Sequence, residues 1–138
     1  MKIAFDTNVL LDTILNRSGR EYALRLMLAA AEEKVTGVVT ANSITDLYYL
    51  SRKGIGDRGA REAVFDILSI FDIAAVDGDI CAMALNAPMG DYEDAVLAAC
   101  AAREGCDHIA TNDKGLLRAD SPVPAKTPAE LLAMMEME

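Results

Sequence analysis

The sequence contains no tryptophan and only one histidine, three cysteines and four prolines among its 138 residues. Three cysteines without a C-x-x-C spacing suggest neither a disulfide framework nor a thiolate zinc site, so we expect Cys81, Cys100 and Cys106 to be reduced thiols. Because His108 is the single histidine, most metal sites built on imidazole ligands are excluded. A Ser-His-Asp arrangement would need this one residue as its base, and its apolar surroundings favour a structural role instead.

Long apolar runs are also absent, and none approaches the roughly 20 residues that a bilayer-crossing helix needs. The N-terminal segment reaches Asp6 before the apolar region of a signal peptide could form. We therefore expect a cytoplasmic protein with no membrane segment. The composition, 52% hydrophobic and 25% charged, is typical of a packed core and excludes a disordered chain. The length predicts one domain spanning residues 1–138.

Positive charge is scarce in the second half of the chain. Residues 1–69 carry nine acidic and nine basic side chains, whereas residues 70–138 carry 13 acidic and four basic ones, so the net charge of −9 lies wholly in the second half. This argues against a broad nucleic-acid-binding face, because phosphate contacts need lysine and arginine. An RNA would have to be recognised by a few local contacts. The basic residues near the expected cleft are Arg17, Arg52, Lys53, Lys114 and Arg118.

Strand-like and helix-like segments alternate along the whole chain. Apolar or β-branched runs predict strands at residues 2–5, 35–40, 71–76 and 108–111, with a weaker fifth strand at 122–126. Apolar spacing and capping residues predict helices at 9–15, 20–34, 42–52, 58–69, 78–87, 91–104 and from 128 onward. This alternation is typical of parallel βαβ units. We predict an α/β fold with three layers, in which helices cover both faces of a central parallel sheet of four to five strands.

Carboxylates stand where such a sheet would present a site. Asp6 ends the first predicted strand and Asp113 follows the fourth, and ligands of open parallel sheets bind beyond the carboxyl ends of the strands. Asp91 and Asp94 begin the helix before the fourth strand, three residues apart and so on one face. Asp46 lies among apolar residues of the helix 42–52, where a carboxylate is costly to bury without a partner.

Each of these carboxylates has an ordinary explanation as a helix cap or a turn residue. Together they would repel one another, because no lysine or arginine of the sequence stands directly beside most of them. A divalent cation with oxygen ligands is the simplest remedy. The pattern therefore predicts one or two ions, Mg²⁺ or Mn²⁺, at this edge of the sheet.

Four short motifs stand in register along the chain, and together they resemble the PIN-domain family. They are Asp6-Thr7-Asn8 after the first strand, Asp46 in the segment 43–47, Asp91-Tyr92-Glu93-Asp94 opening an alanine-rich helix, and Thr111-Asn112-Asp113 after a strand. The resemblance covers nearly the whole chain. It implies a PIN-like fold and a divalent-metal-dependent endoribonuclease that hydrolyses RNA phosphodiester bonds, as in VapC-type toxins of toxin-antitoxin pairs.

The resemblance also implies roles for single residues. Asp6, Asp94 and Asp113 would hold the ions. Asp46 would act as a ligand or orient the attacking water, and Asp91 is a further candidate ligand. Carboxylate-bound ions can supply both water activation and stabilisation of charge on the phosphate. The catalytic set would then be Asp6, Asp46, Asp94 and Asp113, and the polar residues that orient carboxylates or contact the phosphate would be Thr7, Asn8, Thr111, Asn112 and Lys114.

Two apolar segments are candidate contact surfaces. Residues 47–50 are apolar on more than one face of their helix, and the C-terminal segment carries Met134, Met135 and Met137. Packing into the protein's own core is the simpler role for most of them. The resemblance implies a homodimer and an antitoxin whose amphipathic segment lies in a groove between the early helices.

Two other functions remain open at this point. One is a PIN-like module that binds a metal or a partner without cleaving RNA, although such a module has no need to keep four mutually repelling carboxylates. The other is a phosphatase of the haloacid dehalogenase type, suggested by an aspartate after the first strand. That chemistry needs a second aspartate two residues later, where this chain has Asn8, and a lysine, for which Lys114 could serve.

Overall fold

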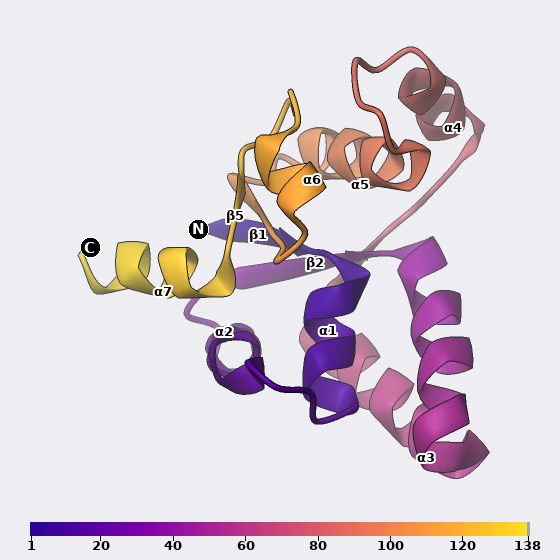
Figure 1. The fold of residues 1–138 in the computed structure, drawn as a ribbon, viewed down its shortest axis with the longest axis vertical. Coiled ribbons are helices and arrows are strands. Elements are labelled where there is room, and N and C mark those ends of the chain that lie inside the picture. Colours follow the sequence, from indigo (N-terminus) through magenta and orange to yellow (C-terminus); the bar gives the residue numbers. More distant parts are fainter. Residues whose placement is uncertain (138) are drawn as a thin grey trace.

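A computed structural model describes residues 1–137 and contains one five-stranded parallel sheet (Figure 1). The strand order is β3-β2-β1-β4-β5, and every neighbouring pair is parallel. This confirms the predicted α/β class and the parallel sheet of four to five strands. The strands are β1 (Lys2–Phe5), β2 (Thr36–Thr40), β3 (Asp72–Ala74), β4 (His108–Ala110) and β5 (Ala125–Lys126).

Helices cover both faces of the sheet, as predicted. In Figure 1, α5 and α6 lie on one side of the strands, and α1, α2 and α7 lie on the other. Side chains alternate accordingly along β1, where Ile3 and Phe5 join one hydrophobic cluster and Ala4 joins the other. The helices are α1 (Thr7–Ile14), α2 (Arg20–Ala31), α3 (Ala41–Ile70), α4 (Gly78–Leu85), α5 (Tyr92–Arg103), α6 (Lys114–Arg118) and α7 (Pro128–Glu136).

The alanine-rich helix α5 is buried on most of its surface. Residues 95–101 are all buried, and the cluster that contains them also contains Ala4 of β1 and Ile109 of β4. Small side chains let a helix approach a sheet closely, since no large group separates the two. The first turn of α5 is thereby fixed relative to the carboxyl ends of β1 and β4.

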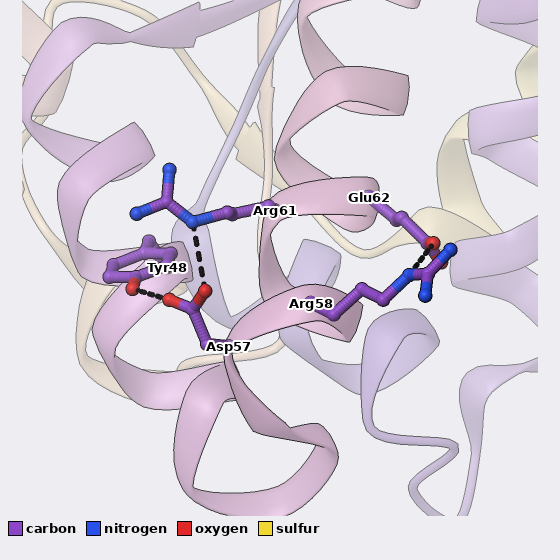
Figure 2. A network of polar contacts seen from close by, with 5 residues as sticks. All are labelled: Tyr48, Asp57, Arg58, Arg61 and Glu62. Carbon is purple, nitrogen blue, oxygen red and sulfur yellow. Dashed lines mark hydrogen bonds and ion pairs between the residues drawn. The ribbon is translucent and has the colours of Figure 1, made fainter.

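The break within α3 confirms the prediction of two helices separated at residues 54–56. The element spans residues 41–70, but its two helical arms meet at a sharp kink at Gly56, which leaves helical geometry with φ 79° and ψ 173°. A positive φ of this kind is accessible mainly to glycine. Across the kink, the Tyr48 hydroxyl donates a hydrogen bond to the Asp57 carboxylate, which also accepts one from Arg61 Nε of its own arm at 2.9 Å (Figure 2). The Tyr48–Asp57 contact joins the two arms of α3.

A second pair of charged residues lies beyond the kink. Arg58 Nε donates to the Glu62 carboxylate at 3.4 Å, one helical turn apart (Figure 2). Both side chains are largely exposed, so this contact contributes little to stability.

Elsewhere the structure differs from the prediction. The strand expected at residues 71–76 is limited to Asp72–Ala74, because the Ala75 carbonyl is bonded to Arg103 of α5 instead of to another strand. Helix α6 was not predicted, since its five residues are too few to show a period. Within residues 1–137, every helix is too short or too polar to cross a bilayer.

Candidate active site

A cleft of about 320 Å³ lies at the edge where β1 and β4 end. Its acidic side chains come from four places in the fold: the end of β1, helix α3, the first turn of α5, and the residue that begins α6. Parallel strands bring these places together because their carboxyl ends share one edge of the sheet. The residues that line the cleft are Asp6, Thr7, Asn8, Asp46, Leu50, Asp91, Glu93, Asp94 and Asp113.

All the carboxylates that the sequence indicated therefore lie in one cleft. Asp6, Asp46, Asp94 and Asp113, predicted as catalytic, line it together with Asp91. The structure places these side chains, whereas their roles stay predictions.

Asp6 is held by a short chain of hydrogen bonds from β4. The hydroxyl of Thr111, which is fully buried, donates to Asp6 Oδ2 at 2.8 Å and accepts the Asp113 backbone N–H at 3.0 Å. Burial raises the pKa of Asp6, and the nearby charge of Asp113 raises it further, while the hydrogen bond from Thr111 opposes the rise. Thr111 thus links the Asp6 carboxylate to the backbone of Asp113.

Asp91 and Asp113 are N-cap residues of the helices that border the cleft. The Asp91 Oδ1 atom accepts the backbone N–H of Asp94 at 3.0 Å, and Asp113 Oδ2 accepts the N–H of Leu116 at 3.1 Å. Such caps satisfy backbone donors and favour the charged carboxylate at the positive end of the helix dipole. Both therefore combine the structural role expected of a single aspartate with a position in the acidic cleft.

The pKa of Asp94 lies well above its usual value. Partial burial is the main reason that its pKa rises from 3.8 to about 6, and the charges of Asp91, Asp6 and Asp113 add to it. Its neighbour Glu93 also has a raised pKa, first because of burial and then because of Asp46 and Asp91. Burial is the main cause of both pKa shifts, and repulsion between neighbouring carboxylates adds to each of them.

Glu93 lines the cleft but was not singled out in the sequence. Its position between Asp91 and Asp94 in the first turn of α5 is the only available signal. A glutamate there is equally well explained as a solvated charge that favours the helix N-terminus.

A buried group of hydroxyls beside the cleft was predicted only in part, because Thr7 was a candidate whereas Thr40 and Ser43 were not. The hydroxyl oxygens of Thr7 and Ser43 are 2.6 Å apart, and Thr40 donates to Ser43 Oγ at 3.1 Å. Thr7, Thr40 and Ser43 are all buried, and they join the starts of α1 and α3.

The predicted polar and basic residues are divided between the cleft and the surrounding surface. Thr7 and Asn8 line the cleft, and Thr111 lies beneath it as the partner of Asp6. Asn112 and Lys114 are exposed and are not part of the cleft lining. Arg17 forms an ion pair with Asp12 at 3.4 Å.

The donor set fits a hard divalent cation, because carboxylate oxygens are the ligands that Mg²⁺ and Mn²⁺ prefer. The side-chain positions do not yet form such a site. In the part of the chain that the structure describes, no three His, Cys, Asp or Glu side chains are arranged so that they could hold one ion. Holding one ion with three of these side chains at once would therefore require the carboxylates to move closer together.

The fold and this acidic edge agree with membership of a known family. The family described as PIN domain matches residues 2–115, and the chain belongs to that family. No curated protein matches the sequence significantly.

Solved structures of toxin-antitoxin proteins have a similar fold. VapBC2 from Rickettsia felis, bound to a promoter DNA fragment, has 19% identity and a TM-score of 0.66, with 92% of this chain and 98% of that chain covered. DNA-bound VapBC from Salmonella typhimurium has 17% identity and a TM-score of 0.69, covering 93% and 98%. VapC20 from Mycobacterium tuberculosis, a toxin that cleaves the sarcin-ricin loop, has 18% identity and a TM-score of 0.66, covering 86% and 95%.

Proposed function

We propose that this protein is a divalent-metal-dependent endoribonuclease and the toxin of a toxin-antitoxin pair. The observation that carries the proposal is the convergence of six carboxylates on one cleft, with no lysine or arginine among the residues that line it. An uncompensated cluster of this kind destabilises the fold, as the raised pKa of Asp94 indicates. Membership of the PIN-domain family and the likeness to VapC20 support RNA as the substrate.

Asp6, Asp94 and Asp113 would hold Mg²⁺ or Mn²⁺, with Asp46 and Asp91 as further ligands or as groups that orient water. One or two bound cations would lower the pKa of an attacking water and offset negative charge on the phosphate. The protein's own hydrogen bonds prepare three of these side chains: Thr111 orients Asp6, and the first turns of α5 and α6 orient Asp91 and Asp113.

The experiment that tests this function is cleavage of total cellular RNA by the purified protein. Parallel reactions contain Mg²⁺, Mn²⁺ or EDTA and are repeated with Asp6→Asn and with Asp120→Asn, an exposed aspartate away from the cleft. We expect metal-dependent fragments from the wild-type protein and Asp120→Asn, and none from Asp6→Asn. Ion binding without cleavage would favour the non-catalytic module, and hydrolysis of a small phosphoester with intact RNA would favour the phosphatase.

We also propose an antitoxin as the partner, and the apolar groove between the arms of α3 as part of its contact surface. The groove has a volume of about 390 Å³, and Tyr49 and Phe65 on its walls are 60% and 69% exposed. The toxin-antitoxin complexes among the similar structures support an antitoxin as the partner, and the exposed aromatic side chains support this groove as a contact surface. A homodimer is the alternative occupant, and light scattering of the purified chain with and without Phe65→Ser distinguishes the two. A dimer that Phe65→Ser dissociates would assign the groove to a second copy.

A further inference from the structure

Three buried hydroxyl groups connect two helices whose first turns border the cleft. Ser43, on the first turn of α3, is only 5% exposed, and its hydroxyl lies 2.6 Å from that of Thr7, the first residue of α1. Thr40, at the end of β2, is 3% exposed and donates to the same Ser43 oxygen at 3.1 Å. Ser43 accepts from Thr40, and its own proton is available for a hydrogen bond to Thr7, so that one hydroxyl connects the ends of two strands.

The bridge replaces an ordinary local contact. Thr40 is the N-cap residue of α3, and threonine at this position usually accepts a hydrogen bond from a backbone N–H of its own helix. Here it makes no such bond, and its hydroxyl donates to Ser43. By contrast, Asp91 and Asp113 do cap their helices at the same edge of the sheet. The start of α3 is therefore built for contact with α1.

The two bridged residues are close in sequence to two carboxylates of the cleft. Thr7 directly follows Asp6, and Ser43 precedes Asp46 by three residues, which places both on one face of α3. The Ser43–Thr7 contact is thus a direct side-chain link between the segment that carries Asp6 and the segment that carries Asp46.

We propose that Ser43 is a positioning residue for the active site and sets the separation of Asp6 and Asp46. The inference rests on the proposed function, since it gives that separation a catalytic purpose. Ser43 does not line the 320 Å³ cleft and acts through Thr7 and α3. In metal sites, groups that orient the ligands from outside typically change affinity or activity by about 10- to 100-fold when they are removed.

The test compares Ser43→Ala with Ser51→Ala. Ser51 is a matched control because it is a fully buried serine of the same helix whose hydroxyl bonds to the carbonyls of Leu47 and Tyr48, within α3. Ser43→Cys keeps the size of the side chain with a weaker hydrogen bond and provides a second variant if Ser43→Ala does not fold.

The first measurement is amide hydrogen exchange of the metal-free proteins. We expect Ser43→Ala to speed exchange in the first turn of α1, at Val9 and Leu10, by about threefold or more. The variant lacks the Ser43–Thr7 hydrogen bond that opposes local opening of this turn. Ser51→Ala should leave those amides unchanged, and Ser43→Cys should lie between. Unchanged exchange in Ser43→Ala would overturn the proposed link.

The second measurement is Mn²⁺ affinity together with the kcat and KM of RNA cleavage. We expect Ser43→Ala to weaken Mn²⁺ binding and lower kcat by about tenfold or more, with KM for RNA within about twofold of wild type. Faster exchange with unaltered Mn²⁺ affinity and kcat would show that Ser43 only stabilises the fold, and would refute its role in positioning Asp6 and Asp46. If the wild-type protein neither binds Mn²⁺ nor cleaves RNA, the proposed function fails, and the exchange rates alone decide whether Ser43 links the two segments.

Discussion

Replacing Asp94 by asparagine is expected to stabilise the metal-free protein while abolishing RNA cleavage. The carboxylate of Asp94 is partly buried beside Asp91, Asp6 and Asp113, and its pKa rises from 3.8 to about 6. A rise of this size corresponds to an upper limit of about 3 kcal/mol of destabilisation by the charged form. Because the side chain is partly exposed, solvent screening reduces the effect, and we expect about 1 to 1.5 kcal/mol.

The sign of the effect determines its pH dependence. The folded protein holds the Asp94 proton more tightly than the unfolded chain does, so stability is highest below about pH 4 and falls as the pH rises through 6. The asparagine side chain of the variant cannot ionise, so the substitution removes this loss. The variant should therefore be more stable than wild type at pH 7.5 and nearly equal to it at pH 4.

Thermal and urea unfolding in EDTA measure this prediction. At pH 7.5 we expect the melting temperature of Asp94→Asn to rise by about 3 to 6 °C, and the difference should vanish near pH 4. Asp120→Asn, at an exposed position in the loop after α6, controls for loss of a negative charge in general. An Asp94→Asn variant that is less stable than wild type at pH 7.5 would refute the reasoning.

Three other outcomes follow from the structure. Thr111→Val removes the hydrogen-bond donor to Asp6 and the acceptor of the Asp113 N–H. We therefore expect the free energy of unfolding in urea to fall by about 1 to 3 kcal/mol and kcat to fall about tenfold. Wild-type values of both would mean that Asp6 needs no such support. Gly37→Ala places a methyl group against the ring of Phe71 in the core, which should cost about 1 to 3 kcal/mol in thermal unfolding, whereas an unchanged melting temperature would contradict that close packing. Mn²⁺ at 100 times its Kd should stabilise the wild-type protein by about 2.7 kcal/mol and Asp6→Asn clearly less, and equal stabilisation of both would place the ion elsewhere.

The sequence was sufficient to predict the sheet and the acidic cleft, because both depend on simple rules. Alternating strand and helix patterns determine a parallel sheet, and a parallel sheet brings Asp6 and Asp113 to one edge. The first turn of α5 follows from Asp91 as a helix cap. These features are local in sequence or follow from topology alone.

Other features depend on contacts between distant residues. Ser43 was missed because a serine or threonine near a helix start is expected to bond to its own helix, whereas Ser43 bonds across to Thr7 of α1. Glu93 resembles any solvated glutamate in a first helical turn until the fold places it beside Asp46. Likewise, the hydrogen bond from Tyr48 to Asp57 joins the two arms of α3 across the kink, and no local pattern predicts it.

The most direct test of the central claim measures ion binding and RNA cleavage in the same samples. Wild-type protein and Asp6→Asn are titrated with Mn²⁺, and bound ions and RNA fragments are quantified at each concentration. We predict that cleavage rises with ion occupancy in the wild-type protein and that Asp6→Asn loses both together. Cleavage that persists in EDTA, or that Asp6→Asn retains at the wild-type rate, would contradict a metal-dependent nuclease built on this acidic cleft.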